Sequence, residues 1–256
     1  MDQGRTVEAG HPNAHAARIE NRIFETADIL AREVAEWLCD LAQAGERAFA
    51  ICLSGGSTPR RLYEELAEPA IASRFPWHRV HWFWGDERFV PRDHTDSNYR
   101  MVYDALLSRV TVHPANIHAI PAERITPEQA AIAYEATLKD FHGSDTLDPG
   151  RPLFDVTLLG IGEDGHTASL FPGQPALQEK RRWVVAVVGA RSEPRITLAY
   201  PALDSSSHVA FLATGKKKSK AVASAKAGNC ETPAALVRPV GRLHWFTDRA
   251  ASSGAI

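Results

Sequence analysis

Short, uninterrupted apolar runs alternate along this chain with longer segments whose apolar residues recur at helical spacing. The run AFAICL at 48–53 is typical of a strand that is covered on both faces, because it has no polar face to turn toward water. The segment before it, 27–45, places Leu30, Val34 and Leu38 on one side of a helix and stops at a glycine. This alternation restricts the chain to folds that pack helices against a buried sheet.

The same alternation continues toward the end of the chain. Further helices are expected over 60–68, 97–110, 127–143 and 216–228. Further strands are expected within 80–85, 153–162, 182–189, 195–200, 208–214 and 243–247. Strands that alternate with helices predict an α/β fold with a mainly parallel sheet covered by helices on both faces.

The domain organisation follows from what interrupts this pattern. No internal repeat, low-complexity tract or long linker divides the chain, so we expect a single domain over residues 18–256. Residues 1–17 are polar and rich in Gly, His and Ala, and we expect them to form a flexible N-terminal segment.

Composition excludes several classes of function. Lys and Arg number 29 against 31 Asp and Glu, a formal net charge of −2, whereas a nucleic-acid or membrane-surface protein needs a basic excess. The apolar runs are too short to cross a bilayer, and the first twenty residues lack the apolar stretch of a signal peptide. Three cysteines without a CxxC pair predict no disulfide framework. We therefore expect a cytoplasmic protein without nucleic-acid or membrane partners.

Three polar, glycine-bearing segments follow predicted strands: SGGSTP (54–59), GDERFVPRDHTDSN (85–98) and GIGEDGHTASLFP (160–172). Ligands of open α/β sheets bind where strands end and helices begin. The connectivity of the sheet could therefore bring these three segments to one edge and form a binding site there.

The segment SGGSTP suits an anion or a sugar hydroxyl. Gly55 and Gly56 allow the backbone to approach a ligand closely, and Ser57 and Thr58 place hydroxyl groups at the start of a helix, where N–H groups and the dipole favour negative charge. A tight turn with a Ser or Thr N-cap explains the same residues about equally well.

The segment GIGEDGHTASLFP carries an acid and a base two residues apart. A carboxylate at Asp164 can fix the tautomer of the His166 imidazole and raise its basicity, as a general base requires. A histidine taken alone is more often a surface or core residue, and the neighbouring glycines and acid make the two interpretations about equal.

Charged residues elsewhere add candidate ligands for an anion. In GDERFVP, adjacent residues of an extended chain point in opposite directions, so at most one or two of Asp86, Glu87 and Arg88 can reach a shared site. A solvated charged loop explains the same residues about twice as well. Arg195 and the lysine run at 216–220 could neutralise a phosphate, although most lysines of such a run face solvent.

Motifs for other chemistries are missing from the sequence. It contains no GxxxxGK[ST], no HExxH and no GxSxG, and GIGEDG has no matching acidic residue after a second strand. We therefore expect no bound metal, no nucleotide and no other cofactor.

The chain closely resembles the 6-phosphogluconolactonase family, which is related to glucosamine-6-phosphate deaminases. Three segments carry the resemblance: LSGGSTPRRLYEEL, WFWGDERFVPRDHTDSNYRM and LLGIGEDGHTASLFP. The resemblance covers nearly everything after residue 20, and DGHTASLFP is its most specific part. It implies a modified Rossmann-like fold and metal-independent hydrolysis of 6-phospho-D-glucono-1,5-lactone to 6-phosphogluconate in the oxidative pentose phosphate pathway.

The resemblance also implies roles for individual residues. His166 would be the family's histidine, with Asp164 as its neighbour, and Arg88 matches the basic member of the family's DER motif. Our own mechanistic hypothesis is that His166 is the general base and acid and that Arg88 or N–H groups of the loops donate to the developing oxyanion. The expected substrate-binding residues are Gly55, Gly56, Ser57, Thr58, Asp86, Asn98, Arg195 and Lys218. The run KKKSK leaves Lys217 as an alternative to Lys218, and Ala199 stands where many relatives carry a hydroxyl residue.

Two other functions remain open. Relatives that deaminate an amino-sugar phosphate carry a glutamate soon after Asp-Gly-His, whereas residues 167–178 of this chain contain no acid. A sugar-phosphate sensor could keep Arg195 and the glycine loop without catalysis, but the presence of both Asp164 and His166 argues against it. The expected partner is a small sugar phosphate, and the expected assembly is a monomer or a weak homodimer.

Overall fold

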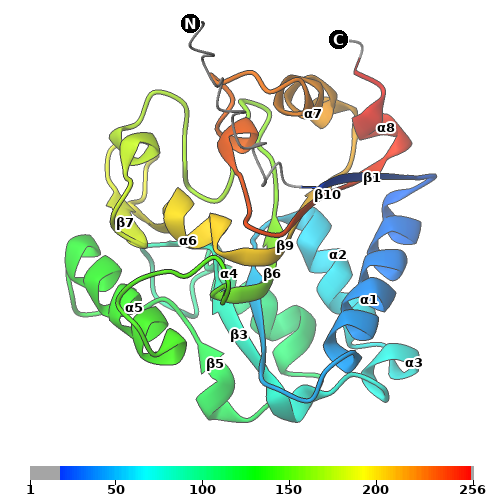
Figure 1. Cartoon of the computed structure of the whole chain (residues 1–256), viewed down its shortest axis with the longest axis horizontal. Helices are drawn as coiled ribbons and strands as arrows, with labels where there is room; N and C mark the ends of the chain where they lie inside the picture. Colours follow the sequence, from blue (N-terminus) through cyan, green and yellow to red (C-terminus); the bar gives the residue numbers. More distant parts are fainter. Residues whose placement is uncertain (1–17, 255–256) are drawn as a thin grey trace, which may run out of the picture.

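A seven-stranded, entirely parallel sheet forms the centre of the structure, a computed structural model that describes residues 18–254 (Figure 1). Its strands, in spatial order, are β1 (Arg18–Phe24), β10 (Arg242–Asp248), β9 (Ser206–Ala213), β6 (Phe154–Leu159), β2 (Phe49–Leu53), β3 (Val80–Trp84) and β5 (Ile117–His118). The predicted α/β class with a mainly parallel sheet is confirmed. The flexible segment expected at residues 1–17 lies outside the described residues.

Helices cover both faces of this sheet. Their bounds are α1 (Ala27–Gln43), α2 (Ser57–Leu66), α3 (Pro69–Ala72), α4 (Asn98–Val102), α5 (Pro127–His142), α6 (Tyr200–Asp204), α7 (Ser219–Lys226) and α8 (Arg249–Ser252). In Figure 1, α1 and α2 lie on one side of the sheet and α5 and α6 on the other. The sheet therefore has no broad face turned to solvent, as its continuous apolar strands require.

The two longest helices begin and end where local chemistry dictates. The Thr26 hydroxyl caps α1 by accepting a hydrogen bond from the Ile29 N–H at 3.3 Å. At the start of α5, Thr126 and Gln129 form a reciprocal capping box, and Pro127 occupies the first turn. Gly143 ends α5 with φ of 71°, a left-handed conformation that glycine adopts without strain. The predicted ends of both helices agree with the structure to within two residues.

Other predicted helices differ from the structure in extent. Helix α2 starts at Ser57, earlier than the predicted 60–68, because Gly56 at φ of 106° turns the chain directly into the helix. The helix predicted over 97–110 is α4 followed by a π-helical turn at Tyr103–Leu107. The segment 216–228 begins with a 3₁₀ turn at Lys216–Lys218 before α7.

A second, antiparallel sheet lies beside the first and was not predicted. Its strands are β4 (Asp86–Arg88), β8 (Arg195–Leu198) and β7 (Val184–Val187), in that order. The segments at 182–189 and 195–200 were correctly predicted as strands but were expected in the main sheet. The short connection between them can join only antiparallel strands, since a parallel pair needs a crossover of a dozen or more residues.

Two strands of the main sheet were missed. Strand β1 is an edge strand in which only Phe24 is buried, so it lacks the apolar run by which the others were found. Strand β5 consists of Ile117 and His118 alone. Neither pattern is distinguishable from a loop in the sequence.

Two buried tyrosines fix the chain at the carboxyl ends of β2 and β3. The Tyr63 hydroxyl of α2 donates to the Ser54 carbonyl at 2.8 Å and accepts from the Ser54 N–H at 2.9 Å. The Tyr134 hydroxyl of α5 makes the same pair of bonds to Trp84, at 3.0 and 2.8 Å. Burial raises the pKa of both phenols, so they remain neutral donors. Each helix thus holds the strand end from which a polar loop departs.

Neighbouring strands also bring histidines into contact. The Nδ1 of His81 on β3 lies 3.0 Å from the Nε2 of His118 on β5, and His208 and His244 form a similar pair at 3.0 Å. Burial lowers the pKa of all four imidazoles, and the neighbouring histidine lowers it further in His118 and His244, each to about 4. Both pairs are therefore neutral in the folded protein at neutral pH.

These pairs predict a loss of stability in acid. As the pH falls below about 6.5, the unfolded chain binds protons that His118 does not accept in the folded state until about pH 4, so the free energy of unfolding decreases across this range. His118→Phe retains a ring against Phe83 and should make the loss between about pH 7 and pH 5 smaller than in the wild type. Urea unfolding at the two pH values measures the difference. The exposed His78→Asn variant should lose as much as the wild type, and an equal loss in His118→Phe would contradict the prediction.

Candidate active site

A cavity of about 360 Å³ lies at the carboxyl edge of the main sheet. It is bounded by the segments that follow β2, β3, β6 and β9 and by the small antiparallel sheet. The sequence-predicted site residues that line it are Gly55, Gly56, Ser57, Thr58, Asp86, Arg88, Asn98, His166, Arg195 and Lys218. Asp164 does not line the cavity but contacts His166. The structure therefore brings together every residue singled out for a sugar-phosphate site.

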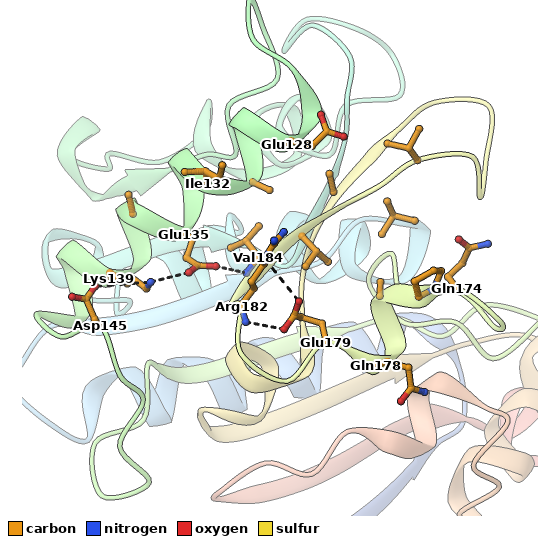
Figure 2. A pocket seen from close by; sticks show the side chains of 18 of the residues that line it. Glu128, Ile132, Glu135, Lys139, Asp145, Gln174, Gln178, Glu179, Arg182 and Val184 are labelled. Carbon is orange, nitrogen blue, oxygen red and sulfur yellow. Dashed lines mark hydrogen bonds and ion pairs between the residues drawn. The ribbon is translucent and has the colours of Figure 1, made fainter.

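A larger cavity of about 910 Å³ lies between α5 and β7 (Figure 2). Several of its charged groups are paired: Lys139 Nζ lies 2.8 Å from a Glu135 oxygen, and Glu135 also accepts the N–H of Trp183 and of Val184. Glu179 lies 4.0 Å from Arg182 and accepts backbone N–H groups beside it. No predicted site residue lines this larger cavity, whereas the predicted cations Arg88, Arg195 and Lys218 all line the smaller one.

The His166 imidazole is held by Asp164. The Asp164 Oδ1 lies 2.5 Å from His166 Nδ1 and 3.2 Å from the His166 backbone nitrogen. Because the carboxylate can only accept, Nδ1 carries the proton and Nε2 is the nitrogen free to act as a base. A Cβ at Gly162 would overlap both the imidazole and the carboxylate, so only glycine leaves room for this pair.

The Asp164 carboxylate has a second partner. Its Oδ2 accepts a hydrogen bond at 2.8 Å from Arg191, which the sequence analysis did not identify. Burial alone would raise the pKa of Asp164, but the hydrogen bonds from His166 and Arg191 outweigh it and leave that pKa below its ordinary value. The group therefore remains a carboxylate throughout the neutral range.

The loop that carries His166 also contains a residue with a strained backbone. Ala168 adopts φ of 46°, one of two non-glycine residues in the left-handed region among those described. Such conformations cost about 1–3 kcal/mol and persist where the surroundings impose them. Here the neighbouring residues impose it: Thr167 donates to the Gly160 carbonyl at 2.9 Å, and the Ser169 N–H donates to Thr197 Oγ1 at 3.1 Å.

Arg88 and Arg195 form the cationic wall of the cavity. They are directly opposite in the pairing of β4 with β8, an arrangement that is destabilising for like charges. Burial and the Arg88 guanidinium lower the pKa of Arg195 from its ordinary value, and its buried Nε has no hydrogen-bond partner among residues 18–254. Arg88 donates to the Asp96 carbonyl at 2.6 Å. Two adjacent, incompletely satisfied guanidinium groups favour the binding of an anion.

The extended-chain argument allowed at most two residues of the DER segment to reach a shared site, and two do so. Asp86 and Arg88 line the cavity, and Glu87 does not. Glu87 is buried and accepts the N–H groups of Arg88, Asn98 and Tyr99, which holds the start of α4. Burial nevertheless raises its pKa. Glu87 is thus a structural residue that fixes the loop containing Asn98.

Polar groups from three other segments complete the cavity. Helix α2 begins after Gly56 and has no side-chain cap. Its first N–H groups are therefore available to an anion at this edge of the sheet. The Asn98 amide donates to the Asp86 carbonyl at 2.9 Å and packs where a Cβ on Gly55 would lie. Lys218 is the lysine of the 216–220 run that lines the cavity, and Lys217 does not. Ala199 is buried outside it.

Among the lining residues that were not predicted, three contact predicted ones through their side chains. Ser169 donates to the Asp86 carboxylate at 2.6 Å, Thr214 lies 2.7 Å from the Thr58 hydroxyl, and Arg191 contacts Asp164. Ser169 stood within a recognised motif, whereas nothing in the sequence around Thr214 or Arg191 marks a site.

Metal sites and membrane-spanning helices were considered for the part of the chain that the structure describes. Within residues 18–254, no group of three or more His, Cys, Asp or Glu side chains is placed to hold a metal ion. In the same range, no helix has both the length and the apolar character needed to cross a membrane.

Comparison with known proteins finds matches over most of the chain. The family described as glucosamine-6-phosphate isomerases/6-phosphogluconolactonase matches residues 25–245. The 6-phosphogluconolactonase of Nostoc sp. is 42% identical over 84% of this chain and 88% of its own length. The chloroplastic 6-phosphogluconolactonase 3 of Arabidopsis thaliana is 40% identical over 90% of this chain and 74% of its own length.

A solved structure agrees as well. The crystal structure of 6-phosphogluconolactonase from Thermotoga maritima superposes with a TM-score of 0.76 and 29% identity, over 91% of this chain and all of that chain. Sequence and fold thus give the same assignment, and the chain belongs to the 6-phosphogluconolactonase family, within the wider group that includes the glucosamine-6-phosphate isomerases.

Proposed function

We propose that residues 18–256 hydrolyse 6-phospho-D-glucono-1,5-lactone to 6-phosphogluconate, with His166 as general base and acid. One observation carries the proposal: an Asp-oriented imidazole shares a cavity with the predicted cations Arg88, Arg195 and Lys218. The relatives named as 6-phosphogluconolactonases support the choice of substrate. The cytoplasmic location stays a prediction, since one of these relatives is chloroplastic.

The reaction divides into two proton transfers at His166. Nε2 removes a proton from water as its oxygen attacks the lactone carbonyl carbon, and the carbonyl electrons move to the oxygen. The tetrahedral intermediate then collapses, the bond from carbon to the ring oxygen breaks, and His166 returns the proton to that oxygen. The products are a carboxylic acid and a hydroxyl group. Asp164 stabilises the imidazolium that exists between the two steps.

The other polar groups act on the charges of the substrate. Arg88 is our candidate donor to the oxyanion, with the first N–H groups of α2 as an alternative; one such donor is worth roughly 3–4 kcal/mol when well aimed. Arg195 and Lys218 bind the phosphate. The remainder of the substrate contacts other residues that line the cavity, namely Gly55, Gly56, Ser57, Thr58, Asp86 and Asn98. Because the phosphate does not react, its binding energy serves to orient the lactone.

The matched family also includes glucosamine-6-phosphate isomerases, so the alternative reaction is the deamination of an amino-sugar phosphate. Opening an amino-sugar ring needs an additional acid near the histidine, and the segment from Thr167 to Gln178 contains none. Its aromatic residue, Phe171, instead places an apolar ring 4.8 Å from the centre of the His166 ring. Release of ammonia from glucosamine 6-phosphate would favour the deaminase.

His166→Asn should abolish most of the catalysis. General acid–base catalysis contributes about 10²–10⁴-fold, so the variant should fall by that order. Freshly generated phosphogluconolactone, assayed by coupled oxidation of the product with the uncatalysed rate subtracted, measures this. The proposal fails if the wild type does not exceed the blank, or if a folded asparagine variant matches it.

Gly162→Ala should mimic this loss without removing a functional group. The new methyl group displaces His166 from Asp164, so we expect kcat to fall about 10²-fold or more while thermal stability changes little, because both side chains are partly exposed. Gly45→Ala is the matched control, since nothing lies within 4 Å of its Cβ position. Normal kcat in Gly162→Ala would show that the pair is not needed.

Arg195→Met should separate phosphate binding from chemistry. A hydrogen bond to a charged group is worth roughly 1.5–3 kcal/mol, so kcat/KM for the phosphorylated lactone should fall about 10–100-fold. The rate with unphosphorylated gluconolactone should change little, and the melting temperature should hold or rise, because the repulsion from Arg88 is relieved. Equal losses with both lactones would place Arg195 at the carbonyl instead. Lys217→Met, an exposed neighbour of Lys218, serves as the control.

A further inference from the structure

Arg191 lies in the connection between β7 and β8 and reaches across to residues 160–172, which we call the histidine loop. Its Nη2 donates to Asp164 Oδ2 at 2.8 Å, and its guanidinium lies 4.5 Å from the centre of the Phe171 ring. The same Phe171 ring contacts His166. Arg191, Asp164, His166 and Phe171 therefore form one connected cluster at the rim of the cavity.

Asp164 needs this second contact because its surroundings do not hold it. Its side chain is 41% exposed, and a carboxylate bonded through Oδ1 alone could rotate its other oxygen into water. With Oδ1 on His166 and Oδ2 on Arg191, both oxygens are occupied and the plane of the carboxylate is fixed. A surface ion pair adds at most about 1 kcal/mol of stability, so the value of the contact lies in orientation.

The hairpin that carries Arg191 has an anchor of its own. Phe171, Val185 and Val187 form a small apolar cluster that is separate from the main core, with Ala190 packed against it. Gly189 turns the chain with φ of 82° just before Arg191. Strand β7 and the histidine loop are thus packed together beneath the Arg191–Asp164 contact.

We infer that Arg191 is a positioning residue, which acts through Asp164 to hold the His166 imidazole in the orientation that hydrolysis requires. The inference rests on the proposed lactonase function. Arg191 also lines the cavity, so the competing role is direct contact with the substrate phosphate. The two roles differ in which kinetic constant they affect: orientation of the base acts on kcat, and phosphate contact acts mainly on KM.

The test is a double-mutant cycle of Arg191→Ala with Asp164→Asn. Partners that orient a functional imidazole are worth roughly 10–100-fold at metal-bound histidines, and for this partly exposed pair we expect the lower end. Arg191→Ala should lower kcat about 10-fold with KM changed less than about 2-fold. In the Asp164→Asn background it should have no further effect, because the residue through which it acts is gone. Arg191→Lys should recover part of kcat.

A measurement without substrate complements the kinetics. The hydrogen-bonded Nδ1 proton of His166 should give a low-field proton NMR signal, assigned by its loss in His166→Asn. That signal should broaden or disappear in Arg191→Ala and persist in Arg182→Ala, an exposed arginine at the other cavity that serves as the control in both experiments.

The outcomes separate the two levels of inference. Unchanged kcat in Arg191→Ala, an increase in KM alone, or full additivity with Asp164→Asn would each overturn the positioning role while leaving an active wild type and the proposed function intact. A wild type no faster than the blank would overturn the proposed function, and the positioning role would fall with it.

Discussion

The site depends on how backbone groups are satisfied where parallel strands end. Ser54 directly follows β2, and Trp84 is the last residue of β3, beyond the end of its pairing with β5. Both residues are buried, so their N–H and C=O groups need other partners. One tyrosine hydroxyl supplies both missing partners in each case, Tyr63 for Ser54 and Tyr134 for Trp84. The loops that follow can therefore leave the sheet as polar, glycine-rich chain while their starting points remain fixed.

Charge in the cavity is arranged against stability. Arg88 and Arg195 face each other across β4 and β8, and one buried nitrogen of Arg195 has no partner in the described chain. Like charges that face each other repel, and a buried charged group that lacks a hydrogen bond also lowers the stability of the fold. A dianionic phosphate would offset the repulsion between the two guanidinium groups, so under the proposed function part of this destabilisation becomes affinity for substrate.

The sequence predicted those features that local pattern determines. Buried strands such as β2 and β6 and capped helices such as α1 and α5 follow from residues close together in the chain. The pairing of β4 with β8 and the contact of Arg191 do not, because they depend on residues far apart in the chain: Asp86 pairs with Thr197, Arg191 meets Asp164 across 27 residues, and Ser169 meets Asp86 across 83. Neither arginine nor serine carries a local pattern that distinguishes such a contact from solvent exposure.

The proposed reaction draws its parts from both sheets. The imidazole stands on a loop of the main sheet, after β6, whereas Arg88 and Arg195 belong to the small one. The carbonyl and the phosphate lie at opposite ends of the lactone, so their spacing must match the spacing of these two groups. The Ser169–Asp86 and Arg191–Asp164 hydrogen bonds each join the histidine loop to the small sheet. The distance between the base and the anion site is therefore set by how the two sheets pack, and the Ser169–Asp86 and Arg191–Asp164 hydrogen bonds hold that packing at the site itself.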